Sequence, residues 1–73
     1  MSALHDLVAR ELGQIGMRAQ DEIEDHESWV DVSEHLGLAW RKLHGREFEE
    51  SATIAATVKR KVDKIIEGGA AWH

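Results

Sequence analysis

The sequence predicts an all-α protein, a small three-helix bundle. Proline is absent from the 73 residues, so no interior helix position lacks its backbone donor. Bulky apolar residues recur at steps of three and four in three separate segments, and this spacing places them on one helix face. The β-branched residues are dispersed and do not alternate with polar ones, which argues against strands. Three amphipathic helices with short connectors form a bundle.

The first helix is expected from Ala3 to Asp25, with Ser2 as its N-cap. Gly13 and Gly16 interrupt it, and each costs about 1 kcal/mol relative to alanine. A straight helix and a helix bent near Gly16 are therefore the two alternatives. The residues expected to face the core are Leu4, Leu7, Val8, Leu12, Ile15, Ala19 and Ile23.

The second helix is expected from Trp29 to His44, after an acidic connector whose carboxylates are too dense to bury. Ser28 is its predicted N-cap. Gly45 stands where a residue of left-handed conformation commonly ends a helix. The apolar stripe comprises Trp29, Val32, Leu36, either Ala39 or Trp40, and Leu43.

The third helix is expected to begin after Ser51 as N-cap and to end at Glu67, before Gly68 and Gly69. Phe48, in the preceding connector, is expected to pack inward. The apolar stripe comprises Ala55, Val58, Val62 and Ile65, flanked by Ile54 and Ile66.

The length allows one domain with a small core. A domain of this size buries only about 60% of the surface of its unfolded chain. There is no cysteine, so neither a disulfide nor a zinc site with thiolate ligands adds stability. Binding of a partner or of a second copy is the remaining source of burial. We expect a single helical domain at 1–69 and a loose tail at 70–73.

Charge is divided unevenly along the chain. Residues 1–36 carry a net charge of −7 and residues 37–73 a net charge of +2, within a total of −5. Ordinary solvated helix faces are one explanation. The alternative is complementarity, in which the acidic end of one molecule meets the basic end of another copy or of a partner.

Several functional classes find no support in the sequence. It contains neither a glycine-rich phosphate loop nor a Ser-His-Asp arrangement, so we expect no enzyme and no cofactor. The pairs Glu22–His26 and Asp31–His35 have helical spacing but match no metal motif, so no metal is expected. No apolar run reaches the roughly 18 residues of a membrane span, and the N-terminus lacks a secretory signal, which predicts a cytoplasmic protein without membrane contact.

The segment from Trp29 to Phe48 also resembles a helix-turn-helix motif. Ser33 is the small residue of the first helix, Gly37 would form the turn, and apolar residues occupy the expected positions. The recognition helix would then direct Arg41, Lys42 and His44 at DNA. Arg46 at a normally apolar position, the early Gly45 and the negative net charge weigh against this alternative.

The function that we expect is a small, non-enzymatic protein-interaction module: a regulator, an inhibitor or an assembly adaptor. Its partner is another protein, a second copy of the chain, or both, and duplex DNA bound by residues 29–48 is the alternative. Tryptophan and arginine are enriched at binding hot spots, and Trp40 adjoins a cationic cluster. The predicted partner-binding residues are Trp40, Arg41, Lys42, His44 and Arg46.

Overall fold

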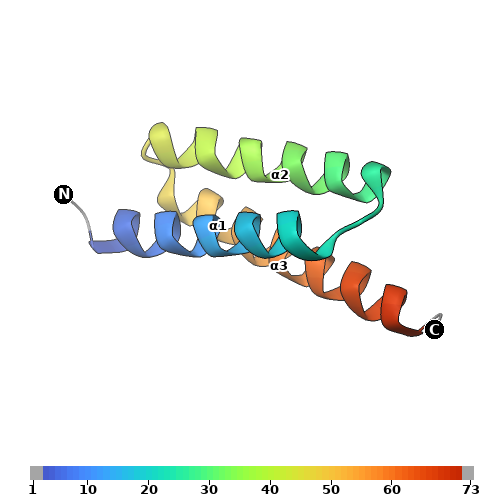
Figure 1. Ribbon diagram of the computed structural model, residues 1–73. Helices are drawn as coiled ribbons and strands as arrows, with labels where there is room; N and C mark the ends of the chain where they lie inside the picture. Colours follow the sequence, from blue (N-terminus) through green and yellow to red (C-terminus); the bar gives the residue numbers. More distant parts are fainter. Residues whose placement is uncertain (1–2, 72–73) are drawn as a thin grey trace.

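The computed structural model describes the backbone of residues 3–71 and the side-chain surroundings of residues 3–67. It is a three-helix bundle of α1 (Ala3–Glu22), α2 (His26–His44) and α3 (Phe48–Ala71). Figure 1 shows α1 and α2 running antiparallel, with α3 crossing behind them and extending past their ends. Every pair of helices is in contact, most extensively α2 with α3. The body measures 45 × 18 × 17 Å.

The core follows the predicted stripes, one from each helix. The buried apolar residues are Val8, Leu12, Ile15, Ala19, Ile23, Val32, Leu36, Ala39, Leu43, Ala55, Val58 and Val62. Leu4 and Leu7 were expected among them but are 41% and 62% exposed. Both stand at the side of the α1 stripe, where the first turn of α1 offers less cover than the middle of the bundle. Phe48 packs partly against the core, as predicted.

The connector between α1 and α2 lies three residues earlier than predicted, because α1 ends at Glu22 and not at Asp25, and α2 begins at His26 and not at Trp29. Asp25, and not Ser28, is the N-cap of α2. Its backbone is extended (φ −74°, ψ 121°), and its carboxylate accepts from the Ser28 amide at 3.0 Å and the Ser28 hydroxyl at 2.7 Å. The extended backbone of Asp25 leaves its carboxylate free to fold back over the first helical turn. The predicted cap Ser2 lies outside the described residues.

The turn between α2 and α3 also differs from the prediction. Gly45 has φ −80°, and the left-handed residue is Arg46, with φ 64°. The Arg46 amide donates to the Leu43 carbonyl at 3.0 Å and the Glu47 amide donates to the Lys42 carbonyl at 2.9 Å. These are the two bonds of a Schellman motif, displaced by one residue from the glycine. α3 then begins at Phe48, so Ser51 lies inside this helix and does not cap it.

Glycines inside the helices do not break them. α1 passes through Gly13 and Gly16, and α2 passes through Gly37 as one continuous helix. The local turn that the helix-turn-helix interpretation placed at Gly37 is therefore not formed. α3 continues to Ala71, so the predicted end at Glu67 is wrong. A glycine disfavours a helix by about 1 kcal/mol without forbidding it, and packing of the same helix offsets this cost. Trp72 and His73 lie outside the described residues.

Candidate interaction surface

The five predicted binding residues do not share one surface. Trp40 is half-buried at the margin of the core and stacks on His44, with ring centroids 6.3 Å apart. Arg41 is exposed one residue further along α2. Lys42 lies on the other side of the helix, where its ammonium pairs with Glu50 at 2.9 Å and Glu47 at 3.4 Å. Arg46 forms the left-handed turn. The structure thus brings together Trp40, Arg41 and His44.

Lys42 stabilises the turn between α2 and α3 through its two ion pairs. The hydrogen bond from its ammonium to Glu50 and the adjacent charge of Glu47 raise the pKa of Lys42. With both carboxylates engaged in the same chain, Lys42 has a structural explanation that needs no partner. It is the least suitable of the predicted residues for binding.

A second tryptophan and one side of α1 extend the surface around Trp40. Trp29 is half-buried three turns before Trp40 and packs against the same core. Gln20 of α1 and Trp29 of α2 line a common depression, which places these two helix sides next to each other. We name this surface the α1–α2 face. It comprises Ala9, Gly13, Gly16 and Gln20 of α1 and Trp29, Ser33, Gly37, Trp40 and His44 of α2.

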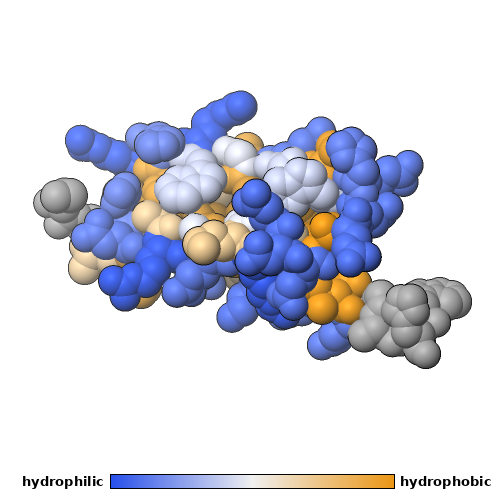
Figure 2. All heavy atoms as spheres, viewed as in Figure 1, coloured by the Kyte–Doolittle hydropathy of each residue, from blue (hydrophilic) through white to orange (hydrophobic). Residues whose placement is uncertain are grey.

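The α1–α2 face is uncharged along its middle. In Figure 2, residues of near-neutral hydropathy gather over α1 and α2, between blue hydrophilic residues at the two ends. A methyl group added at Gly13 or Gly37 would meet nothing within 4 Å, so the packing of this chain requires neither glycine. Met17 (69% exposed) and Val30 (39% exposed) lie at the outer borders, one or two helical turns from these glycines.

Charges of opposite sign border the two halves of this face. The half containing the start of α1 and the end of α2 is bordered by Arg10, Arg41 and Arg46, with Asp6 paired to His5 at 3.2 Å. The other half, at the end of α1 and the start of α2, is bordered by acids. These acids are Asp21, Glu24, Glu27 and Glu34.

Two ion pairs, in contrast, join α3 to the other two helices. Arg18 of α1 bonds to Asp63 of α3, and Asp31 of α2 bonds to Lys61 of α3. The hydrogen bond to Lys61 lowers the pKa of Asp31, and the bonds to Asp63 and Glu22 raise that of Arg18. Both pairs connect helices and thereby support the bundle.

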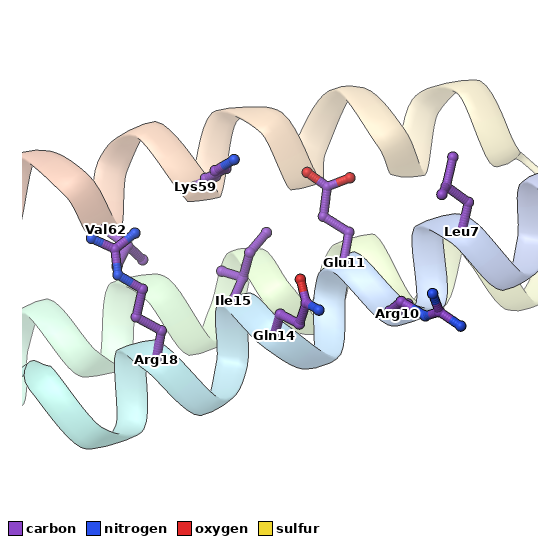
Figure 3. Close-up of a pocket in the computed structure, with 8 residues that line it drawn as sticks. All are labelled: Leu7, Arg10, Glu11, Gln14, Ile15, Arg18, Lys59 and Val62. Carbon is purple, nitrogen blue, oxygen red and sulfur yellow. The ribbon is translucent and has the colours of Figure 1, made fainter.

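A groove of about 320 Å³ lies on the opposite side of α1, between α1 and α3. Figure 3 shows Leu7, Glu11 and Arg18 pointing from α1 toward α3, while the Arg10 side chain points away from α3. Ile15 and Val62 form its apolar floor. The guanidinium of Arg18 is already engaged with Asp63 and Glu22. Glu11, Gln14 and Lys59 also line the groove, and they do so from two different helices.

Over residues 3–71, no helix has the length and apolarity needed to cross a membrane. Within the same part of the chain, no three His, Asp or Glu side chains gather closely enough to hold a metal ion. Comparison with protein-family models, curated proteins and solved structures gave no match for this chain.

The sequence-based prediction named Trp40 and its neighbours but did not include the part of the candidate surface that α1 contributes. Ala9, Gly13, Gly16 and Gln20 repeat at steps of four, three and four, directly beside the core stripe. That spacing indicates a side of the helix without charged residues, and from it the α1 part of the candidate surface could have been predicted. Which neighbouring helix this side meets depends on the handedness of the bundle, which the spacing does not contain.

Proposed function

We propose that the protein is a small, non-enzymatic interaction module of the cytoplasm that binds protein through the α1–α2 face. The observation that carries this proposal is the placement of Trp40. Its ring stacks on His44 at the margin of the core, next to exposed Arg41 and an uncharged surface. Tryptophan and arginine are among the residue types most enriched at the hot spots that dominate binding energy in protein interfaces. The cysteine-free chain suits a reducing compartment.

The energetic role of Trp40 distinguishes a binding residue from a core residue. Because four other residues of α2 are buried, α2 retains its core contacts when Trp40 is truncated. We expect Trp40→Ala to lower the free energy of unfolding by less than about 1.5 kcal/mol, below the 3–5 kcal/mol typical of a fully buried aromatic. Binding to a protein partner should weaken by about 2 kcal/mol or more.

The experiment compares immobilised full-length baits in lysate of the source organism, with bound proteins identified by mass spectrometry. The baits are the wild type, Trp40→Ala, the conservative Trp40→Phe, and Lys64→Ala on the exposed side of α3 as the matched control. A protein retained by the wild type, by Trp40→Phe and by Lys64→Ala but lost with Trp40→Ala supports the proposal. Retention of the lysate's own copy of this chain, with the same dependence on Trp40, supports the proposal as well.

A DNA-shift assay at two salt concentrations examines the alternative function. Duplex DNA binding that weakens with salt, and that disappears when Arg41 and Lys42 are both replaced by alanine, would contradict the proposal. If the surface binds protein, the same double change chiefly slows association through the loss of Arg41, because border charges steer the encounter.

A further inference from the structure

The opposite charges at the two halves of the α1–α2 face indicate which partner it fits. We propose that a second copy of this chain covers the face, in a two-fold symmetric dimer whose two faces run antiparallel. The proposal rests on the proposed function, since it names the occupant of the same surface. The two-fold axis lies in the plane between the two faces and runs across their helices. It sets the basic half of each copy on the acidic half of the other, so the complementary contact forms twice.

The border charges are available for such contacts. Arg10 and Arg41 are exposed, and neither forms an ion pair within the described part of the chain. The same holds for Asp21, Glu24 and Glu27 at the other end. On the side of α1 and α2 that faces α3, Arg18 and Asp31 are already paired with residues of α3, whereas Glu11, over the residues that the structure describes, is not. Unpaired charges of both signs therefore border the α1–α2 face.

The middle of the face suits close contact between two copies. It contains no charged side chain, so burying it leaves no unpaired ion. Trp40 lies in the basic half and Trp29 in the acidic half, so the two-fold axis places both indoles of each copy in the interface. Both are only half-buried in the single chain and have surface left to cover.

The length of the α1–α2 face is set by its two helices. α1 and α2, of 20 and 19 residues, each span about 30 Å at 1.5 Å per residue, whereas the 45 Å long axis of the molecule includes the part of α3 that extends past them. The largest fully buried side chains within the described residues are two leucines, Leu12 and Leu43, followed by valines. A core of this size gains from any further apolar burial.

The test uses two charge-reversed variants that should fail alone and succeed together. Arg10→Glu with Arg41→Glu makes both halves acidic, and Asp21→Lys with Glu24→Lys and Glu27→Lys makes both halves basic, since Glu34 is then the one remaining acid of the acidic border. Each variant repels its own copies at both contacts, whereas the mixture restores both contacts in a heterodimer. Arg60→Glu with Lys64→Glu, on the exposed side of α3, is the control with the same charge change as the first variant.

Sedimentation equilibrium and native mass spectrometry measure the species present, against a monomer mass of 8.2 kDa. We expect the wild type and the control to dimerise with similar affinity and with a dissociation constant that rises with salt. Each reversed variant should dimerise at least tenfold more weakly, and the equimolar mixture should return to within about threefold of the wild type. Circular dichroism confirms that every variant is helical.

Two results overturn the proposal. One is a wild type that stays monomeric up to about millimolar concentration, and the other is a reversed pair that dimerises as the wild type does without needing its counterpart. If the monomeric wild type still binds a different protein through Trp40, the second copy is wrong and the proposed function stands. If no protein binds the face in either experiment, both proposals fail.

Discussion

The hydroxyl of Ser51 in α3 donates a hydrogen bond to the backbone carbonyl of Ala39 in α2, at 2.8 Å. Both residues are completely buried, at 0% exposure. Their small side chains allow α2 and α3 to approach closely, and α2–α3 is the most extensive helix contact in the bundle. Ser51 is also the single buried polar residue among those described, and its hydroxyl is satisfied. It joins the C-terminal part of α2 to the first turn of α3.

The first prediction concerns this bond. Ser51→Ala should lower the free energy of unfolding by about 1 kcal/mol, the usual net contribution of a hydrogen bond in a folded protein. Ser51→Val should cost about 1–3 kcal/mol, because the added methyl groups have no space between the helices. Urea unfolding followed by circular dichroism measures both.

The matched control is Thr53→Ala, whose exposed hydroxyl bonds to Glu49 within α3 itself. It should change stability by less than about 0.5 kcal/mol. Equal stabilities of Ser51→Ala and Thr53→Ala would show that the contact between α2 and α3 contributes nothing through its hydrogen bond.

The second prediction concerns the left-handed conformation of Arg46. Arg46→Gly should stabilise the protein by up to about 1 kcal/mol, since the steric cost of φ 64° is relieved and part of the gain is lost to the freer unfolded chain. Arg46→Val should destabilise it by about 1 kcal/mol or more, because a β-branched residue strongly disfavours this conformation.

Gly45→Ala serves as the control at the same turn. Gly45 has φ −80°, and an added Cβ would lie 3.5 Å from the Arg41 carbonyl, which is ordinary contact. The variant should therefore be tolerated. If Gly45→Ala lowered the free energy of unfolding by about 1–2 kcal/mol and Arg46→Gly did not raise it, the residue in the left-handed conformation would be Gly45 and not Arg46.

The third prediction concerns the glycines of the α1–α2 face. Gly13→Ala and Gly37→Ala should each raise the free energy of unfolding of the isolated chain by about 1 kcal/mol, because alanine favours the helix and the added methyl group meets nothing. Thermal unfolding at micromolar concentration measures this. Destabilisation by either change would show that the packing of the isolated chain requires glycine at that position.

The sequence predicted the stripes well because burial follows helical spacing, as Val32, Leu36 and Leu43 show. The helix ends were harder to predict for a physical reason. Asp25 and Ser28 are both good N-cap residues, and the choice depends on where the backbone leaves the previous helix. Buried Ile23 still donates to the Ala19 carbonyl at 2.9 Å, which sets that point. The hydrogen bond is local to the end of α1, but the burial of Ile23 depends on packing against the other helices and has no local signature.

The position of Trp40 was predictable only in part. Spacing alone allowed either Ala39 or Trp40 in the core stripe, and the structure buries Ala39 because Ser51 approaches it. Trp40 is thereby turned to the margin. The contact between two small residues, Ala39 in α2 and Ser51 in α3, determines which side of α2 faces the core. Such a contact cannot be predicted from the sequence of one helix.

The last prediction concerns pH and the cap of α2. The hydrogen bonds from the hydroxyl and the amide of Ser28 lower the pKa of Asp25 below its ordinary 3.8. As the pH falls, the unfolded chain therefore takes up a proton at this carboxylate at a higher pH than the folded chain does. The stabilisation by the charged cap is complete above pH 3.8 and is lost as the pH falls through the lower pKa of the folded state. Asp31, whose pKa Lys61 lowers, contributes with the same sign.

We expect Asp25→Ala to unfold at a lower urea concentration than the wild type at pH 7, and this difference should stay constant down to about pH 5 and narrow below pH 3.8. Asp25→Asn keeps an acceptor for the Ser28 amide but carries no charge, so its difference from Asp25→Ala should not vary with pH. Unfolding midpoints between pH 2 and pH 7 decide the matter. A difference between wild type and Asp25→Ala that is unchanged at pH 2 would assign the cap to hydrogen bonding alone, without a contribution from the charge of Asp25.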